Sequence, residues 1–136
     1  RYGETERCHR LCLAQFQLAD LCEGRRLPEC VSGHGRDALH PFPAVYVSAN
    51  APQAWSASTP IVLVQALLGI RAQAGHTLWL DPCLPEWLPE LRLHGLRVGS
   101  AAVDVHFLRD ADGKTHFDVL DGSENLQVRR GVPDDP

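Results

Sequence analysis

Methionine is absent from this 136-residue chain, which also lacks a strong net charge and any long apolar run. The formal net charge is only −4, so the basic stripe typical of nucleic-acid-binding proteins is missing. The longest apolar stretch, 61–68, contains Gln65 and falls short of the roughly 18 residues of a membrane span. No charged start followed by an apolar stretch indicates a secretory signal. We therefore expect a cytoplasmic protein without nucleic-acid or membrane partners and, because no methionine starts it, a segment of a longer chain.

Cysteine occurs five times, an odd number with irregular spacing, at positions 8, 12, 22, 30 and 83. This pattern argues against a disulfide framework and favours reduced thiols in the cytosol. Cys8, His9 and Cys12 raise the hypothesis of a zinc site, since Cys8 and Cys12 share one face of a helix. A structural zinc ion needs four ligands, and Cys22 would lie about three turns farther along. We interpret these cysteines as small core residues, and we expect no metal ion or cofactor.

The first part of the chain has the pattern of an amphipathic helix over residues 4–23. Its apolar side chains recur at spacings of three and four, and Gly24 is a suitable C-terminal stop. The residues expected on the buried face are Cys8, Leu11, Cys12, Leu18, Ala19 and Cys22.

Residues 52–70 predict a second helix, with Pro52 at its first helical position. Pro60 either kinks this helix or restarts it with Thr59 as the cap. Nearly every residue from 61 to 68 is apolar, so we expect this helix to be buried on most sides. Since two helices cannot cover such a surface, we also expect partner helices from elsewhere in the protein.

The long stretch 25–51 between these helices contains three prolines, at positions 28, 41 and 43. Loops longer than twenty residues without secondary structure are unusual in compact domains and are often functional. After the second helix, residues 76–90 hold three closely spaced prolines and are expected to be extended or turn-like.

The rest of the chain alternates apolar and polar residues, the period of a β-strand. Strands are expected at 91–98, 101–108 and 115–120, with an Asp112-Gly113 turn between the last two, one more short strand at 125–130, and a frayed tail at 131–136. The predicted inward-facing residues are Val103, Val105, Phe107, Phe117 and Val119. The fold class is therefore α+β: helices followed by a small antiparallel sheet.

Several sequence blocks together resemble the C-terminal end of bacterial amylo-α-1,6-glucosidases, the glycogen-debranching type of glycoside hydrolase, related to mannosylglycerate-hydrolase-like enzymes. These blocks are RYG at 1–3, RLPE at 26–29, PFP at 41–43, PQAW at 52–55, VLVQALLGIR at 62–71 and LDPCLPEWLPELRLHGLRVG at 80–99. The catalytic domain of that family is an (α/α)6 toroid of six helical hairpins. The resemblance implies that residues 1–90 are the end of the toroid and that 91–130 form a β tail.

The resemblance also implies a role for Glu29, the carboxylate of the RLPE block. Enzymes of this type carry a Glu at the mouth of the barrel, in the loop between the last hairpins, where it acts as the general base of an inverting hydrolysis. That chemistry needs two carboxyl groups about 6.5–9.5 Å apart, with a water beside the base. From the residue type alone, Glu29 is an ordinary exposed loop residue.

The partner acid is expected upstream of this segment. Asp20, on the first helix, and Asp37, in the same loop as Glu29, do not match the acid motif of the family. We therefore expect the isolated chain to be inactive and to need the missing N-terminal helical portion of the protein.

Trp55 and Gln53 of the PQAW block are candidate substrate-binding residues. Sugar rings present apolar faces that stack on tryptophan, and an amide can hydrogen-bond a sugar hydroxyl. The alternatives are that Trp55 anchors the core at the start of a helix and that Gln53 lies on the surface. Two function classes remain open: part of a glycosidase that acts on an α-glucosidic oligosaccharide, or a noncatalytic carbohydrate-binding or structural module.

Overall fold

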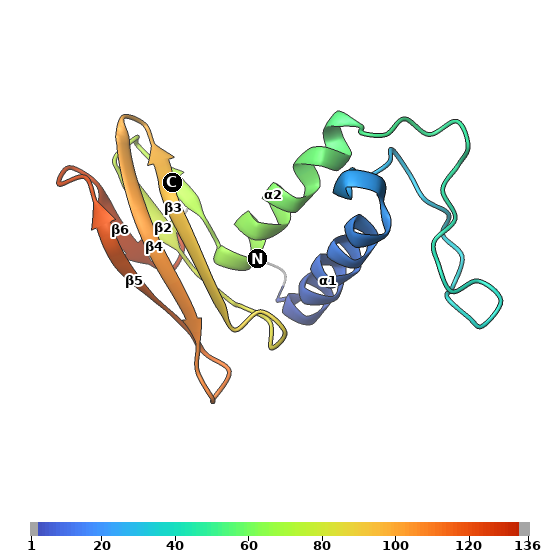
Figure 1. Cartoon of the computed structure of the whole chain (residues 1–136). Helices are drawn as coiled ribbons and strands as arrows, with labels where there is room; N and C mark the ends of the chain where they lie inside the picture. The colour runs from blue at the N-terminus through green and yellow to red at the C-terminus, as the bar shows by residue number, and fades with distance from the viewer. Residues whose placement is uncertain (1–2, 134–136) are drawn as a thin grey trace. The chain divides into compact units, whose positions relative to one another are not determined.

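The computed structural model describes residues 3–133, which form a mixed α+β structure and confirm the expected class (Figure 1). In chain order the elements are α1 (Thr5–Leu21), the 3₁₀ helix η1 (Glu23–Arg25), α2 (Ala54–Leu68), β1 (Arg71–Gln73), β2 (Thr77–Leu80), β3 (Glu90–Val98), β4 (Ala101–Arg109), β5 (Thr115–Gly122) and β6 (Gln127–Arg130). Two compact units divide the chain: a helical unit, Glu6–Leu63, and a β unit that runs from Val64 onward and includes the first few residues. Among the described helices, none has the length and apolarity needed to cross a bilayer.

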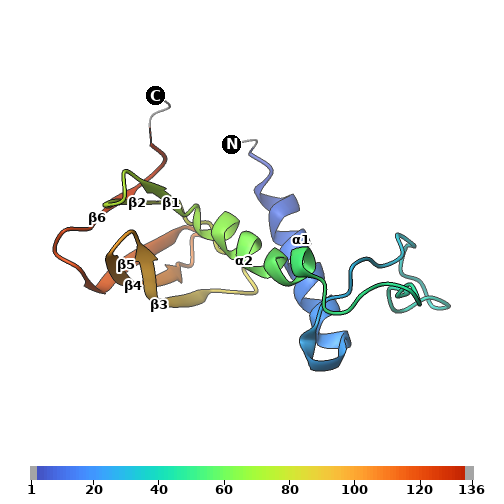
Figure 2. The ribbon, with the colours of Figure 1, turned by 90° about the horizontal axis from the view of Figure 1, so that it is seen from above.

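The β unit contains two three-stranded sheets, ordered β1-β2-β6 and β3-β4-β5 (Figure 2). The expected strands of the second sheet are present, and Asp110–Lys114 hydrogen bonds close the predicted turn between β4 and β5. Two features differ from the expectation. Strand β1 lies just after the predicted second helix, where no element was expected, and β2 lies in the stretch 76–90 that was expected to be extended or turn-like but was not assigned to a sheet. The predicted last strand, β6, runs parallel to β2 in the other sheet.

Both sheets contribute side chains to one apolar core. Its fully buried members are Leu68, Leu78, Leu80, Leu84, Val98, Val103, Val105 and Phe107. The inward orientation predicted for Val103, Val105 and Phe107 is confirmed, and Phe117 packs half-buried against the cluster. The burial predicted for Val119 is wrong, because this side chain is 47% exposed. Although Val119 pairs with Val105, it lies on β5, the edge strand of its sheet, where less of the core covers it.

The C-terminus of α2 is joined closely to the chain that follows it. The N–H of Asp81 donates to the carbonyl of Leu68, and the N–H of Cys83 donates to that of Leu67. Both carbonyls belong to the last turn of the helix, where the helix itself supplies no N–H donor for them. Gly69 has a φ of +60°, and a Cβ there would lie 2.6 Å from the Asp81 carbonyl oxygen. Only glycine allows this turn and this close approach together.

In the helical unit, α1 is two residues shorter than predicted at its C-terminal end and is followed directly by η1. Gly24, the predicted stop, has a φ of +60° and lies inside η1, so α1 ends three residues before it. Cys12 and Leu18 are buried, but Leu11 is 60% exposed, so its predicted place on the buried face is wrong. The expected frayed tail, 131–136, carries no helix or strand at 131–133, and its last three residues lie outside the described residues.

Helix α2 begins at Ala54 rather than Pro52, and it continues through Pro60 without a restart. Just before the proline, the hydroxyls of Ser58 and Thr59 both donate to the carbonyl of Trp55, at 2.9 and 3.0 Å. The apolar stretch of α2 is less covered than expected. Ile61 and Val62 are 63% and 57% exposed, because the described part of the chain supplies no helix to cover them.

Candidate functional site

The loop that carries Glu29 is a lasso, residues 26–53, whose two arms are hydrogen-bonded to each other. The N–H of Glu29 donates to the carbonyl of Asn50 at 2.8 Å, and the N–H of Ser32 donates to Ala44 at the same distance. Between them, Val31 and Val45 form an isolated antiparallel bridge. A few long-range backbone bonds therefore give shape to a stretch that the sequence predicts only as irregular.

The Glu29 carboxylate belongs to this contact between the arms. Its Oε2 accepts hydrogen bonds from the Asn50 side-chain amide at 3.2 Å and, more weakly, from the Asn50 N–H at 3.4 Å. Neighbouring Leu27 and Pro28 are buried, and Glu29 itself is half-buried. The buried Leu-Pro pair and Asn50 together define where this carboxylate lies, so Glu29 is more ordered than a loose loop residue would be.

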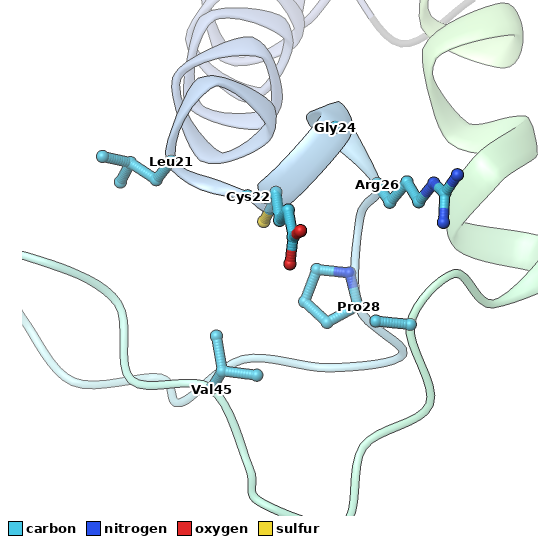
Figure 3. A pocket seen from close by; sticks show the side chains of 8 residues that line it. Leu21, Cys22, Gly24, Arg26, Pro28 and Val45 are labelled. Atoms are coloured by element: carbon cyan, nitrogen blue, oxygen red, sulfur yellow. The ribbon is translucent and has the colours of Figure 1, made fainter.

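An open cavity of about 480 Å³ lies beside this contact (Figure 3). Its walls come from the end of α1, from η1 and from both arms of the lasso: Leu21, Cys22, Glu23, Gly24, Arg26, Pro28, Val45 and Ala51. Glu29 does not line the cavity, but it directly follows Pro28, and Asn50 directly precedes Ala51. The carboxylate that does line the cavity is Glu23, which sequence reasoning did not single out.

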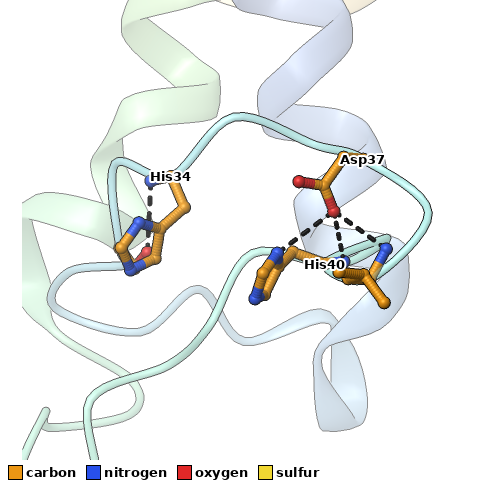
Figure 4. A network of polar contacts seen from close by, with 5 residues as sticks. His34, Asp37 and His40 are labelled. Carbon is orange, nitrogen blue, oxygen red and sulfur yellow. Dashed lines mark hydrogen bonds and ion pairs between the residues drawn. The ribbon is translucent and has the colours of Figure 1, made fainter.

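No second carboxylate of the helical unit is shown in contact with Glu29, within the residues that the structure describes. Asp20 forms an ion pair with Arg25 at 3.2 Å. Asp37 accepts hydrogen bonds from the N–H groups of His40 and Leu39 and contacts the His40 ring at 3.1 Å (Figure 4). The His40 N–H, followed by that of Leu39, lowers the pKa of Asp37, so this group is a poor general acid.

The two candidate substrate-binding residues have different environments. Trp55 is 60% exposed on the first turn of α2, so the alternative that it anchors the core does not describe this structure. Gln53 is half-buried, and its side-chain oxygen accepts the Ala54 N–H at 2.9 Å. That bond uses the amide oxygen at the start of the helix and leaves the amide nitrogen for other contacts. Neither residue lines the cavity.

The hypothesis of a zinc site at Cys8, His9 and Cys12 finds no support. Within residues 3–133, no group of three or more His, Cys, Asp or Glu side chains is arranged to hold a metal ion. Burial, helped by the adjacent Cys8, raises the pKa of the Cys12 thiol to about 12. A thiol that stays protonated is a weak metal ligand. None of the five cysteines, all of which lie within the described residues, forms a disulfide.

The partner of Glu29, Asn50, could not be found from the sequence. It is 21 residues away and belongs to no motif, and its role arises only when the arms of the lasso pair. Chemically, the arrangement offers one ordered carboxylate beside an open cavity, without a described acid opposite it. Comparison with known proteins adds no relative, since no family model, curated protein or solved structure matches this chain.

Proposed function

We propose that this chain is the C-terminal part of a glycoside hydrolase of the amylo-α-1,6-glucosidase type. It would act on α-glucosidic linkages of glycogen-like oligosaccharides by inverting hydrolysis, with Glu29 as the general base. The general acid and the rest of the (α/α)6 toroid belong to the N-terminal portion of the same protein. Five cysteines that form no disulfide favour a cytoplasmic location for this enzyme.

One observation carries the proposal: the hydrogen bonding of the Glu29 carboxylate. Both contacts from Asn50 go to Oε2, and the described residues give Oε1 no hydrogen-bond partner. A general base needs this asymmetry, because one oxygen orients the group and the other accepts a proton from water. The half-buried position also limits the orientations that the side chain can adopt.

The exposed residues of the helical unit support the fragment interpretation. Trp55, Ile61 and Val62 present apolar surface on α2, where a soluble domain would normally bury side chains of this size. Neighbouring helices of a toroid would cover Ile61 and Val62. Trp55, at the start of α2, would remain available to a sugar ring.

The test is turnover of an α-linked oligosaccharide by the full-length protein that contains this segment. In that protein Glu29→Gln should lower kcat by at least about a hundredfold, because a general base typically contributes about 10²–10⁴-fold. Glu23→Gln is the matched control, since Glu23 is an exposed carboxylate that lines the nearby cavity. It should retain near-parental kcat, and both variants should melt like the parent.

Near-parental turnover of Glu29→Gln would refute the assignment of the base. The alternative function, a noncatalytic carbohydrate-binding or structural module, predicts another pattern. In that case the full-length protein would bind oligosaccharide without cleaving it, and Trp55→Ala would weaken binding while Glu29→Gln would leave it unchanged.

A further inference from the structure

A cavity of about 440 Å³ lies in the β unit, beside the turn that joins β4 to β5. Its other side is the segment ahead of β3, which contributes Glu86 and Pro89. The N–H of Arg109 donates to the carbonyl of Pro89 at 2.8 Å, so a backbone hydrogen bond joins the two sides. Sites for small molecules usually measure about 300–1,000 Å³, and this cavity falls within that range.

The charged side chains that line this cavity have hydrogen-bonding capacity that the described residues do not use. Nε of Arg109 is buried and donates to no acceptor in the described part of the chain. Glu86 and Asp112 are exposed, and neither forms a hydrogen bond or ion pair with a described residue. Buried polar groups of proteins are nearly always hydrogen-bonded, so the Nε–H is expected to meet an acceptor from outside the chain.

Two features fix the turn and the place of the guanidinium. Asp110 accepts the N–H of Lys114 at 2.8 Å and contacts the His116 ring at 2.7 Å, so this carboxylate serves the turn itself. The guanidinium of Arg109 lies against Gly113, where a Cβ would be 2.9 Å from Nη1 and would push it aside. The guanidinium and the two remaining carboxylates of the cavity are therefore left for a ligand.

We infer that this cavity binds a neutral sugar, whose hydroxyl groups accept hydrogen bonds from Arg109 and donate them to Glu86 and Asp112. An anionic ligand would meet the two carboxylates, and a cationic ligand would meet the guanidinium. A hydroxyl group both donates and accepts, so a polyol suits both kinds of side chain without a net charge. Trp87, next to Glu86, is 38% exposed, and tryptophan stacks well on the apolar face of a sugar ring. The inference does not depend on Glu29, but the choice of α-glucosides as probes rests on the proposed function.

The test is a titration of the isotope-labelled chain with methyl α-glucoside and with maltose, followed by the NMR shifts of the backbone amides. We expect saturable shifts at residues 86–88 and 109–113. Arg109→Gln should weaken the affinity about tenfold or more, because a hydrogen bond from a charged group is lost. Glu86→Gln keeps the shape of an exposed side chain and should weaken it about threefold, since an amide accepts less strongly than a carboxylate. Arg97→Gln removes an exposed arginine of β3 that does not line the cavity, and it should bind like the parent.

Three results would overturn the inference. The first is the absence of shifts at these residues with about 0.1 M sugar, a concentration far above a millimolar Kd. The second is unchanged affinity in both Arg109→Gln and Glu86→Gln. The third is tighter binding of glucuronate, an anion, or of glycine, a zwitterion, than of the neutral glucosides.

The same titration separates this site from the proposed hydrolase site. Shifts confined to the residues around Glu29 and Trp55 would overturn the sugar site in the β unit and leave the hydrolase proposal intact. Shifts at 86–88 and 109–113 would support the sugar site whatever the kcat of Glu29→Gln, which decides the hydrolase proposal separately.

Discussion

The two units of the chain differ in how fully they bury their own apolar side chains. The β unit has a continuous core to which both sheets contribute, and eight of its apolar residues are almost inaccessible to water. The helical unit buries few large apolar side chains and leaves many exposed: Leu11, Leu21, Leu39, Phe42, Val45, Tyr46, Val47, Trp55, Ile61 and Val62.

This difference indicates which part of the structure is held by local interactions. In the β unit, strands β3, β4 and β5 follow one another with short connections, so each pairs with its neighbour in sequence. In the helical unit, the lasso depends on a few bonds between residues more than ten positions apart. We expect the β unit to be the stable part and the helical unit to need further protein around it.

The largest effect is expected from opening the core of the β unit. Phe107 is fully buried, and its ring centroid lies 6.1 Å from that of Phe117. Phe107→Ala should lower the free energy of unfolding by about 3–5 kcal/mol, through lost burial and the cavity left behind. Denaturant unfolding followed by the fluorescence of Trp79 and Trp87, both in the β unit, measures it. Val47→Ala, in the exposed lasso, is the control and should change the free energy of unfolding little. Equal losses in the two variants would contradict the difference in burial between the two units.

A smaller effect is expected from one buried hydroxyl. Thr115 is 3% exposed, and its Oγ1 accepts the N–H of Leu84 at 2.8 Å. Thr115→Val keeps the shape of the side chain but leaves this N–H without an acceptor, which should cost about 1–3 kcal/mol in the same unfolding experiment. Thr59→Val on α2 removes a hydroxyl of the helical unit that bonds to an exposed carbonyl, and it should cost much less. A comparable loss in both variants would argue against a more tightly packed β unit.

The exposed face of α2 should make the chain associate with itself. Ile61 and Val62 are adjacent and more than half exposed, so a second copy of the chain can cover them. Val62→Glu should weaken association of the 136-residue chain by about fivefold or more in sedimentation velocity, because it places a charge in the contact. Val119→Glu, on the exposed edge strand of the β unit, should leave association unchanged. A parent chain that stays monomeric at high concentration would contradict this prediction.

The smallest effect concerns acid stability of the β unit. The N–H of Gly95, followed by the ring of His94, lowers the pKa of Asp104 below its ordinary value of 3.8. Since the folded pKa is depressed, this stabilisation is present above pH 3.8 and is lost as the pH falls through the folded-state value. Tm should therefore drop on acidification below about pH 4, and less steeply in Asp104→Asn. Asp118→Asn, one strand away, should keep the parental slope, and identical slopes for all three proteins would exclude Asp104 as a source.

The sequence predicted those parts of the fold that depend on local patterns. Alternation and the Asp112-Gly113 turn were enough to predict β4 and β5, and Gly24 lies three residues beyond the observed end of α1. Strand β1 was missed because its three residues, Arg71–Gln73, show no alternation and form a strand only by pairing with β2. The parallel partner of β2 comes from more than forty residues away, so its sheet could not be foreseen.

In the candidate site, too, features that depend on local sequence were predicted and features that depend on long-range pairing were missed. The length of the loop and its prolines indicated a functional segment around Glu29, and the resemblance supplied a role for this residue. Asn50 was missed because its contact with Glu29 depends on how the two arms of the lasso pair. The general acid remains a prediction about chain outside this segment.

Chemical rescue of Glu29→Ala by azide tests the central claim most directly. Azide is already a nucleophile, so it needs no base and can take the place of the activated water in the space that the lost carboxylate leaves. In the full-length protein we predict that Glu29→Ala loses at least about a hundredfold in turnover and that azide restores part of it. The product should be a glycosyl azide with the configuration opposite to that of the α-linked substrate. A variant that keeps parental turnover, or that azide leaves inactive, would contradict the role of Glu29 as the base.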